Sequence, residues 1–345
     1  MNSSMPQLAS ASTHTDAQSA TCERLAAPAY PNLNAARVLA ALAVIWIHTP
    51  QSAVLAPSVT LGRFAVPFFL GASLLLVLQS DRFGRDRSLS EYLRSRLVRV
   101  IAPFAFWSIV YLAFKGVKRL IAPNQPNDFP GWEACLLGTA YHLWFLPYLF
   151  VATTLTFALH PLRQSTLLQA LLCSSVAVVG VVAAILPCPT VPPAWEAVTY
   201  MWLALPGLAI SLIASFVWLR CPDLTRHNHM TRLAAATVVV LSTWALWNQP
   251  RSGIWEGLAG NAFLYLAIDP ITLRWSQVVA RFAPLSYGVY LSHLLFLKVA
   301  ESAAQKLGWS ASPTLDLACF LGAASGSLAL SFLLARSRWT RWAIG

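Results

Sequence analysis

Two ionisable side chains, Arg37 and His48, stand at the two ends of a purely apolar run, VLAALAVIWI. Along an α-helix this offset turns through three full turns and about 20°, so both side chains lie on nearly the same face, about 16 Å apart. Arginine is a permanent cation that suits phosphate groups, whereas histidine acts as a base near neutral pH. One helix face therefore carries an anion-binding group at one end and a proton-transfer group at the other.

Each of these two residues also has a structural interpretation. Arg37 could be a snorkelling anchor at a cytoplasmic helix end, and His48 a paired polar group inside a helical bundle. Ionisable residues inside membrane segments are rare, however, and commonly functional. Because both residues fall on one stripe, we favour the functional interpretation: Arg37 at the inner mouth of the first span and His48 near its outer end.

Three further segments repeat this theme. His142, in YHLWFLPYLF, falls at the same predicted depth as His48, and His293 lies in the polar stretch LSYGVYLSHLLFL. Arg96 and Arg99 are three residues apart, and α-helical spacing puts them on one face. The structural alternatives are an interfacial histidine for His142, an interhelical hydrogen bond for His293 and a role in topology for the arginine pair. These alternatives stay open at the level of sequence.

The elements that would position these groups are membrane-spanning helices. Hydrophobic residues make up 57% of the 345-residue chain and charged residues only 11%, against about 25% charged residues in soluble domains. A span needs about 20 mostly apolar residues, and helices satisfy their own backbone in lipid. We therefore predict an all-α, polytopic membrane bundle of about ten transmembrane helices. The expected ranges are 35–55, 61–80, 98–118, 142–160, 167–187, 200–219, 233–248, 254–269, 284–303 and 314–335.

Charge orients the predicted bundle. The net charge of +11 favours cytoplasmic loops rich in arginine over a nucleic-acid surface, because no basic face alternates with exposed aromatic residues. Both termini are expected in the cytoplasm. Residues 1–32 read as a disordered tail, 33–337 as the membrane domain and 338–345 as a short cytoplasmic tail.

The cysteines do not suggest a metal site. The six cysteines are scattered, with no CxxC pair, so we expect no bound metal. A disulfide between Cys135 and Cys188 is conceivable on the predicted outer side, but no other feature supports it.

Four motifs together resemble the integral-membrane acyltransferase-3 family. They are Arg37-x10-His48, Arg96-x-x-Arg99 followed by Pro103, His142-Leu-Trp-Phe-Leu-Pro147, and Ser286-Tyr-Gly-Val-Tyr-Leu-Ser-His293. They occur in the family's order and span about residues 33 to 335. The chain departs from the family pattern at Asn34, where an Asp is usual, and at VPFFLGASLLL, where FFxxSG is common. Many relatives also carry a soluble C-terminal domain, whereas this chain is expected to be a stand-alone membrane domain.

The resemblance implies an enzyme that takes an acyl group, commonly acetyl, from acetyl-CoA as a co-substrate. The acceptor would be a hydroxyl of an envelope or exopolysaccharide glycan, or of a lipid-linked saccharide, at the cell inner (cytoplasmic) membrane. It also implies a catalytic set of His48, Arg37, His142 and His293, with Arg96, Arg99 and Arg37 holding CoA. The competing class is a transporter or flippase of lipid-linked saccharides, which predicts several acidic or paired charges in mid-membrane. The chain has few such acids, and this favours the enzyme.

Overall fold

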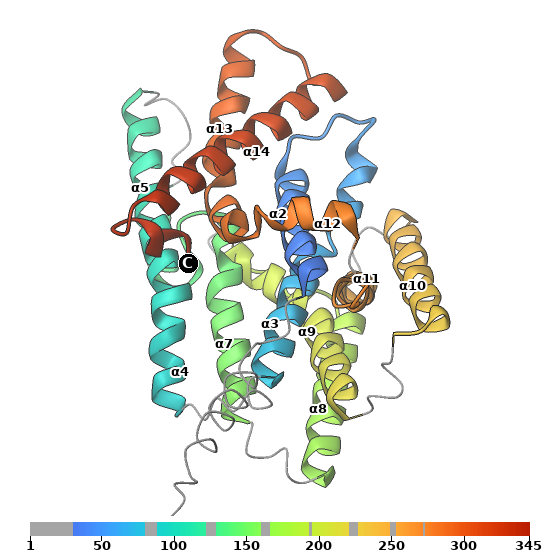
Figure 1. The fold of residues 1–345 in the computed structure, drawn as a ribbon. Helices are drawn as coiled ribbons and strands as arrows, with labels where there is room; N and C mark the ends of the chain where they lie inside the picture. The colour runs from blue at the N-terminus through green and yellow to red at the C-terminus, as the bar shows by residue number, and fades with distance from the viewer. Residues whose placement is uncertain are drawn as a thin grey trace, which may run out of the picture.

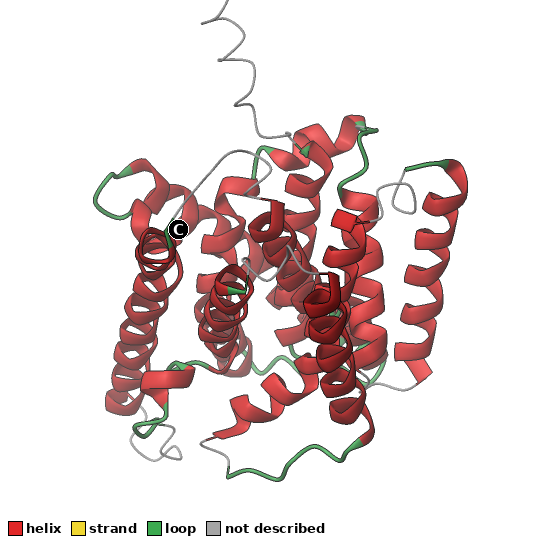
Figure 2. Cartoon of the chain, turned by 90° about the horizontal axis from the view of Figure 1, so that it is seen from below, coloured by secondary structure: helices red, strands yellow, loops and turns green. Residues whose placement is uncertain are grey.

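The fold is entirely helical in the part of the chain that the structure describes. The computed structural model places residues 30–79, 88–121, 129–159, 166–192, 195–220, 227–248, 253–271 and 273–345. Figure 2 shows helices and loops in these ranges and no strand. The all-α prediction is therefore confirmed. The predicted N-terminal tail lies almost wholly outside the described residues, as do Arg82, Arg85 and Arg87 of the predicted cytoplasmic loop.

Long helices occupy every predicted range. They are α2 (Pro31–His48), α3 (Ala65–Gln79), α5 (Ala102–Ile121), α7 (Phe145–Ala158), α8 (Thr166–Ile185), α9 (Glu196–Arg220), α10 (His229–Asn248), α11 (Gly253–Ala267), α13 (Ser286–Lys306) and α14 (Pro313–Arg336). Short helices join them: η2 (Ala56–Gly62), α4 (Leu89–Arg96), η4 (Leu97–Ile101), α6 (Ala134–Leu137), η5 (Tyr141–Trp144), α12 (Arg274–Ala280), η8 (Ala283–Leu285) and η9 (Arg341–Ile344).

Five of the described stretches are long and apolar enough to cross a membrane: Ala56–Gln79, Leu89–Ile121, Glu196–Trp218, His229–Asn248 and Pro313–Arg336. Asn32–His48 and Ala170–Ile185 are shorter apolar helices. The chain is thus a multi-pass membrane protein by composition. The count of about ten spans and the cytoplasmic placement of both termini stay predictions.

The first predicted span ends earlier than its hydropathy suggests. α2 ends at His48, and Thr49 adopts an extended conformation with φ −65° and ψ 140°. Pro50 follows, and the residue before a proline is driven out of the helical region. His48 is therefore the last helical residue, and the predicted range 35–55 is wrong beyond it.

Helix α2 lies at the centre of the bundle. It contacts α3, α11, α12, α13 and α14, while the α4–α5 rod and α10 stand at opposite edges in Figure 1. Ala35, Ala36, Ala40 and Ala41 are almost fully buried. Small residues of this kind let helix backbones approach closely in membranes, so α2 is tightly held along its length.

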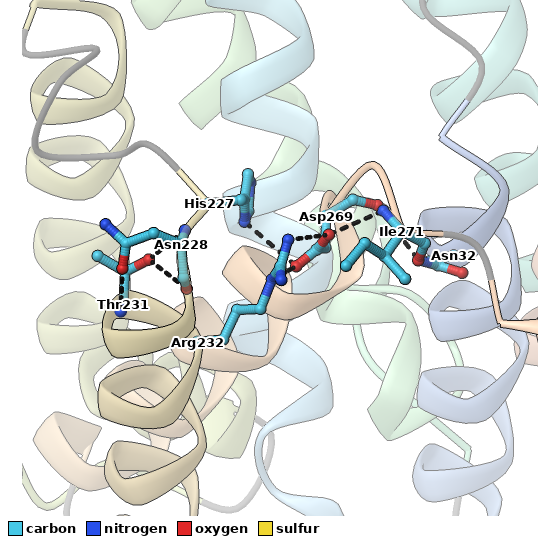
Figure 3. Close-up of polar contacts among 7 residues, drawn as sticks. All are labelled: Asn32, His227, Asn228, Thr231, Arg232, Asp269 and Ile271. Atoms are coloured by element: carbon cyan, nitrogen blue, oxygen red, sulfur yellow. Dashed lines mark hydrogen bonds and ion pairs between the residues drawn. The ribbon is translucent and has the colours of Figure 1, made fainter.

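A polar clamp holds the first turn of α2. Asn32 Nδ2 donates hydrogen bonds to the carbonyl oxygens of Asp269 (3.2 Å) and Ile271 (2.6 Å), and Asn32 Oδ1 accepts one from Ser276 Oγ (2.6 Å). Figure 3 shows Asn32 beside the loop between α11 and α12. This loop is thereby tied to α2 five residues before Arg37.

The clamp continues through an ion pair to α10. The Arg232 guanidinium donates to both carboxylate oxygens of Asp269, and His227 Nδ1 lies 3.5 Å from the same carboxylate (Figure 3). Burial outweighs the nearby carboxylate and lowers the pKa of His227. His227 is therefore mainly neutral at pH 7, and Arg232 supplies the balancing charge for Asp269.

We predict that Asp269→Asn destabilises the protein by about 3 kcal/mol, because removing one partner leaves a partly buried guanidinium uncompensated. The loss would appear as a lower melting temperature of the detergent-solubilised protein. Glu301→Gln is the matched control. It breaks the pair with Lys298 (2.7 Å), whose lysine side chain is 46% exposed, and such pairs contribute about 0–1 kcal/mol. Equal shifts for both variants would contradict the clamp.

Candidate active site

Three histidines from distant parts of the chain meet in one cluster. The ring centroids of His142 and His293 lie 4.8 Å apart, those of His48 and His293 5.4 Å, and those of His48 and His142 6.4 Å. His142 and His293 are buried, whereas His48 is half-buried. The structure therefore brings together every histidine that the sequence singled out.

A different local device positions each ring. His48 closes α2 and is oriented by the helix end before Pro50. His142 lies in η5, which follows a sharp turn at Gly138 (φ +88°). His293 lies in the second turn of α13, a helix that contacts α2. The Tyr141 ring adds a wall, with its centroid 4.9 Å from that of His48.

Backbone carbonyls determine which ring nitrogen of each buried histidine carries its hydrogen. His293 Nδ1 lies 2.6 Å from the Tyr290 carbonyl oxygen, and His142 Nε2 lies 3.3 Å from that of Leu291. A carbonyl oxygen only accepts, so these ring nitrogens are the donors. His293 Nε2 and His142 Nδ1 are left buried without a hydrogen-bond partner among the described residues.

Two tyrosines complete this frame. Tyr290 Oη donates to the His142 carbonyl oxygen (2.5 Å), and Tyr111 Oη donates to the Leu291 carbonyl oxygen (2.8 Å). The segment carrying His142 is therefore fastened to α13, and α13 is fastened to α5. The sequence does not predict the hydrogen bond made by Tyr111, because a tyrosine among apolar residues is typical of an interfacial anchor.

Arg37 lies in the second turn of α2, eleven residues before His48. Its side chain is half-buried and makes no hydrogen bond or ion pair with any residue that the structure describes. One continuous helix joins the two groups, so the predicted separation of about 16 Å along one face holds. A half-buried cation without a counter-charge is costly and calls for an anionic partner.

The sequence predicts that Arg96 and Arg99 lie on one α-helical face, but the structure does not have a continuous α-helix there. A π-helical turn, η4, separates α4 from α5. Pro103 lies four residues after Arg99 and cannot donate the hydrogen bond that an α-helix would send to the Arg99 carbonyl. The π-helical turn accommodates the missing backbone hydrogen bond. Such turns are frequent at functional sites.

The two arginines therefore have different surroundings. Arg96 is half-buried, and its Nε donates to Tyr92 Oη (3.0 Å) with the guanidinium over the tyrosine ring. Arg99 is exposed. Arg96 has a fixed position, and Arg99 is free to reach a ligand.

The described ranges contain no group of three or more His, Cys, Asp or Glu side chains that could hold a metal ion. Cys135 and Cys188 are free thiols, so the disulfide considered from the sequence is absent. Imidazole can take up and release a proton near neutral pH, so the three histidines are suited to proton transfer.

Comparison with known proteins decides the family. The model of one family, described as an acyltransferase domain, matches residues 30–336, which is nearly the whole chain. The chain belongs to the acyltransferase-3 family. Neither the curated proteins nor the solved structures include a match to this membrane acyltransferase. The residue sets predicted from the resemblance thus lie inside the matched region.

We predict that Gly138→Ala lowers both stability and activity of this acyltransferase. The left-handed backbone at φ +88° strains any other residue by about 1–3 kcal/mol. A Cβ here would also come within 2.6 Å of Leu143 Cβ, next to His142.

The matched control is Gly308→Ala, at φ +69° with open space around it. This variant meets backbone strain but no clash and lies far along the chain from the cluster. Melting temperature and turnover should fall further for Gly138→Ala. Equal losses in the two variants would show that the turn does not position His142.

Proposed function

We propose that this protein is an O-acyltransferase of the bacterial inner membrane. It moves an acyl group, most simply acetyl, from cytoplasmic acyl-CoA to a hydroxyl of an envelope or exopolysaccharide glycan. The observation that carries this proposal is the arrangement on α2. Arg37, which has no counter-charge among the described residues, lies in the second turn of α2, and His48, within the cluster of histidine rings, is the last residue of that helix. Family membership supports acyl transfer as the chemistry.

The arginines suit the phosphates of CoA. Phosphates form strong, charge-assisted hydrogen bonds with guanidinium groups. Arg37 lacks a counter-charge among the described residues, and Arg99 is exposed. We assign these two residues, together with Arg96, to the phosphate groups of the donor. The acyl end of CoA would then extend along α2 towards His48.

The histidine cluster suits the transfer step. His48 takes the proton from the acceptor hydroxyl as general base, a role that contributes about 10²–10⁴-fold. The hydroxyl oxygen attacks the thioester carbon, so a C–O bond forms and the C–S bond breaks. The proton held by His48 then passes to the departing thiolate of CoA. The products are the acylated glycan and free CoA.

We predict that His48→Ala lowers acyl transfer by at least about 100-fold, because the base is lost. Arg37→Ala should chiefly raise the KM for acyl-CoA. Acyl transfer in cells is measured by mass analysis of the envelope polysaccharide. Acyl transfer by the purified protein is then measured with acetyl-CoA as the donor. His229→Ala and Arg338→Ala, at exposed positions, are the matched controls. Normal transfer by both His48→Ala and Arg37→Ala, inserted at wild-type level, would end this assignment.

We predict that CoA raises the melting temperature of the purified protein and that Arg99→Gln reduces this shift. Loss of one charge-assisted contact should weaken CoA binding by about tenfold or more. The kcat at saturating acyl-CoA should change little, because Arg99 is assigned to the phosphates rather than to the thioester. A CoA shift that is unchanged in Arg99→Gln would remove Arg99 from the donor site.

A further inference from the structure

We propose that His293 is the positioning residue of His48: its Nε2 accepts a hydrogen bond from the His48 ring and so sets which His48 nitrogen acts as base. This inference rests on the proposed function, in which His48 is the general base. It adds a defined partner, a defined atom and a direction of hydrogen bonding. The resulting chain runs from the acceptor hydroxyl to His48, then to His293, and ends at the Tyr290 carbonyl.

The first support is the state of the His293 ring. A neutral imidazole has one N–H and one lone pair. The Tyr290 carbonyl oxygen, 2.6 Å from Nδ1, accepts a hydrogen bond from the N–H at that nitrogen. Nε2 is therefore an acceptor, yet it is buried without a partner among the described residues. An unpaired buried acceptor is costly, so a donor is expected at this position.

The second support is the geometry of the rings. The His48 and His293 rings are stacked, at 17°, with centroids 5.4 Å apart, and no hydrogen bond joins them in this structure. Two imidazoles joined edge to edge by an N–H···N bond of about 3 Å have centroids a little over about 5 Å apart, so the bond can form at nearly this separation once the rings turn from stacked to edge to edge. Catalytic hydrogen bonds are often long without substrate and tighten when it binds. By contrast, His142 lies farther from His48, at 6.4 Å and 62°.

The third support is what a base requires. His48 can accept a proton from the hydroxyl at one nitrogen only if its other nitrogen carries the hydrogen. That N–H needs an acceptor, and His48 makes no hydrogen bond to a described residue. A nucleophile, a base and an orienting third group form the general logic of such sites. Here His293 takes the place that a carboxylate has in serine hydrolases.

This arrangement also limits the roles of the two buried rings. In the tautomers held by Tyr290 and Leu291, His142 and His293 present lone pairs, not N–H groups, at their free nitrogens. A lone pair repels a developing oxyanion, whose stabilisation requires donors. Neutral His293 therefore acts on His48 rather than on the thioester.

Two substitutions separate this role from a packing role. In His293→Gln the side-chain amide reaches the position of Nε2 and offers an oxygen as acceptor. In His293→Asn the shorter amide reaches only the position of Nδ1, so it keeps the bond to the Tyr290 carbonyl and loses the acceptor. The inference predicts that His293→Asn lowers kcat by at least about tenfold, with KM for acyl-CoA within about twofold of wild type. His293→Gln should retain most of the turnover.

The other outcomes overturn the inference. A packing role predicts the reverse order, with His293→Asn active and His293→Gln impaired. Equal activity in both variants, or equal loss in both, is also incompatible with a hydrogen bond accepted at Nε2. His229→Gln and His229→Asn are the matched controls at an exposed position. A failure of the proposed function itself is seen separately, as full activity of His48→Ala.

A second measurement tests the inference even if the His293 variants do not insert into the membrane. Histidine-selective ¹⁵N NMR of the intact protein reports the tautomer of each ring. His293 should show a protonated Nδ1 and an unprotonated Nε2, and His48→Ala should shift the Nε2 resonance. A protonated Nε2 on His293, or no shift in His48→Ala, would overturn the inference.

Discussion

The site depends on two consecutive backbone carbonyls of α13, those of Tyr290 and Leu291. Each accepts a hydrogen bond from a histidine ring nitrogen, and the Leu291 carbonyl accepts another from Tyr111. Each bond contributes only about 1 kcal/mol to stability. Their effect is directional, since they determine where the lone pairs of His142 and His293 lie. Without them two buried imidazoles would be free to exchange tautomers, and no defined proton path would exist.

Helix α2 connects this cluster to Arg37. Its buried alanines hold it against its neighbours, and Asn32 ties its first turn to the α11–α12 loop. A rigid helix keeps Arg37 and His48 at a constant separation of about 16 Å. Placing a cation and an imidazole in an apolar bundle is costly, and the proposed reaction gives both a use: one binds the phosphates of the donor and the other receives a proton.

The sequence predicts the helical fold, which the structure confirms, because helices depend on local patterns. Apolar runs predicted the helix ranges, and the offset between Arg37 and His48 predicted a shared face. The meeting of His48, His142 and His293 depends on tertiary packing, so residue spacing alone could not show it. The tautomers depend on carbonyls several residues away in space.

Local backbone chemistry explains the remaining differences. Pro50 ends α2 at His48, and Pro103 introduces the π-turn that separates the surroundings of Arg96 and Arg99. Hydropathy predicts neither the early end of α2 nor the π-turn, although both prolines are present in the sequence. The pairing of Asp269 with Arg232 joins residues 37 positions apart, and only the folded chain brings them together.

The most direct test of the central claim is a structure of the protein bound to a thioether analogue of acetyl-CoA, determined by cryo-electron microscopy. The account predicts phosphates beside Arg37 and Arg99, with the acyl carbon within about 5 Å of a His48 ring nitrogen, close enough for a bound hydroxyl to bridge them. An acyl group held away from the histidine cluster, with His48 facing lipid or protein alone, would contradict it.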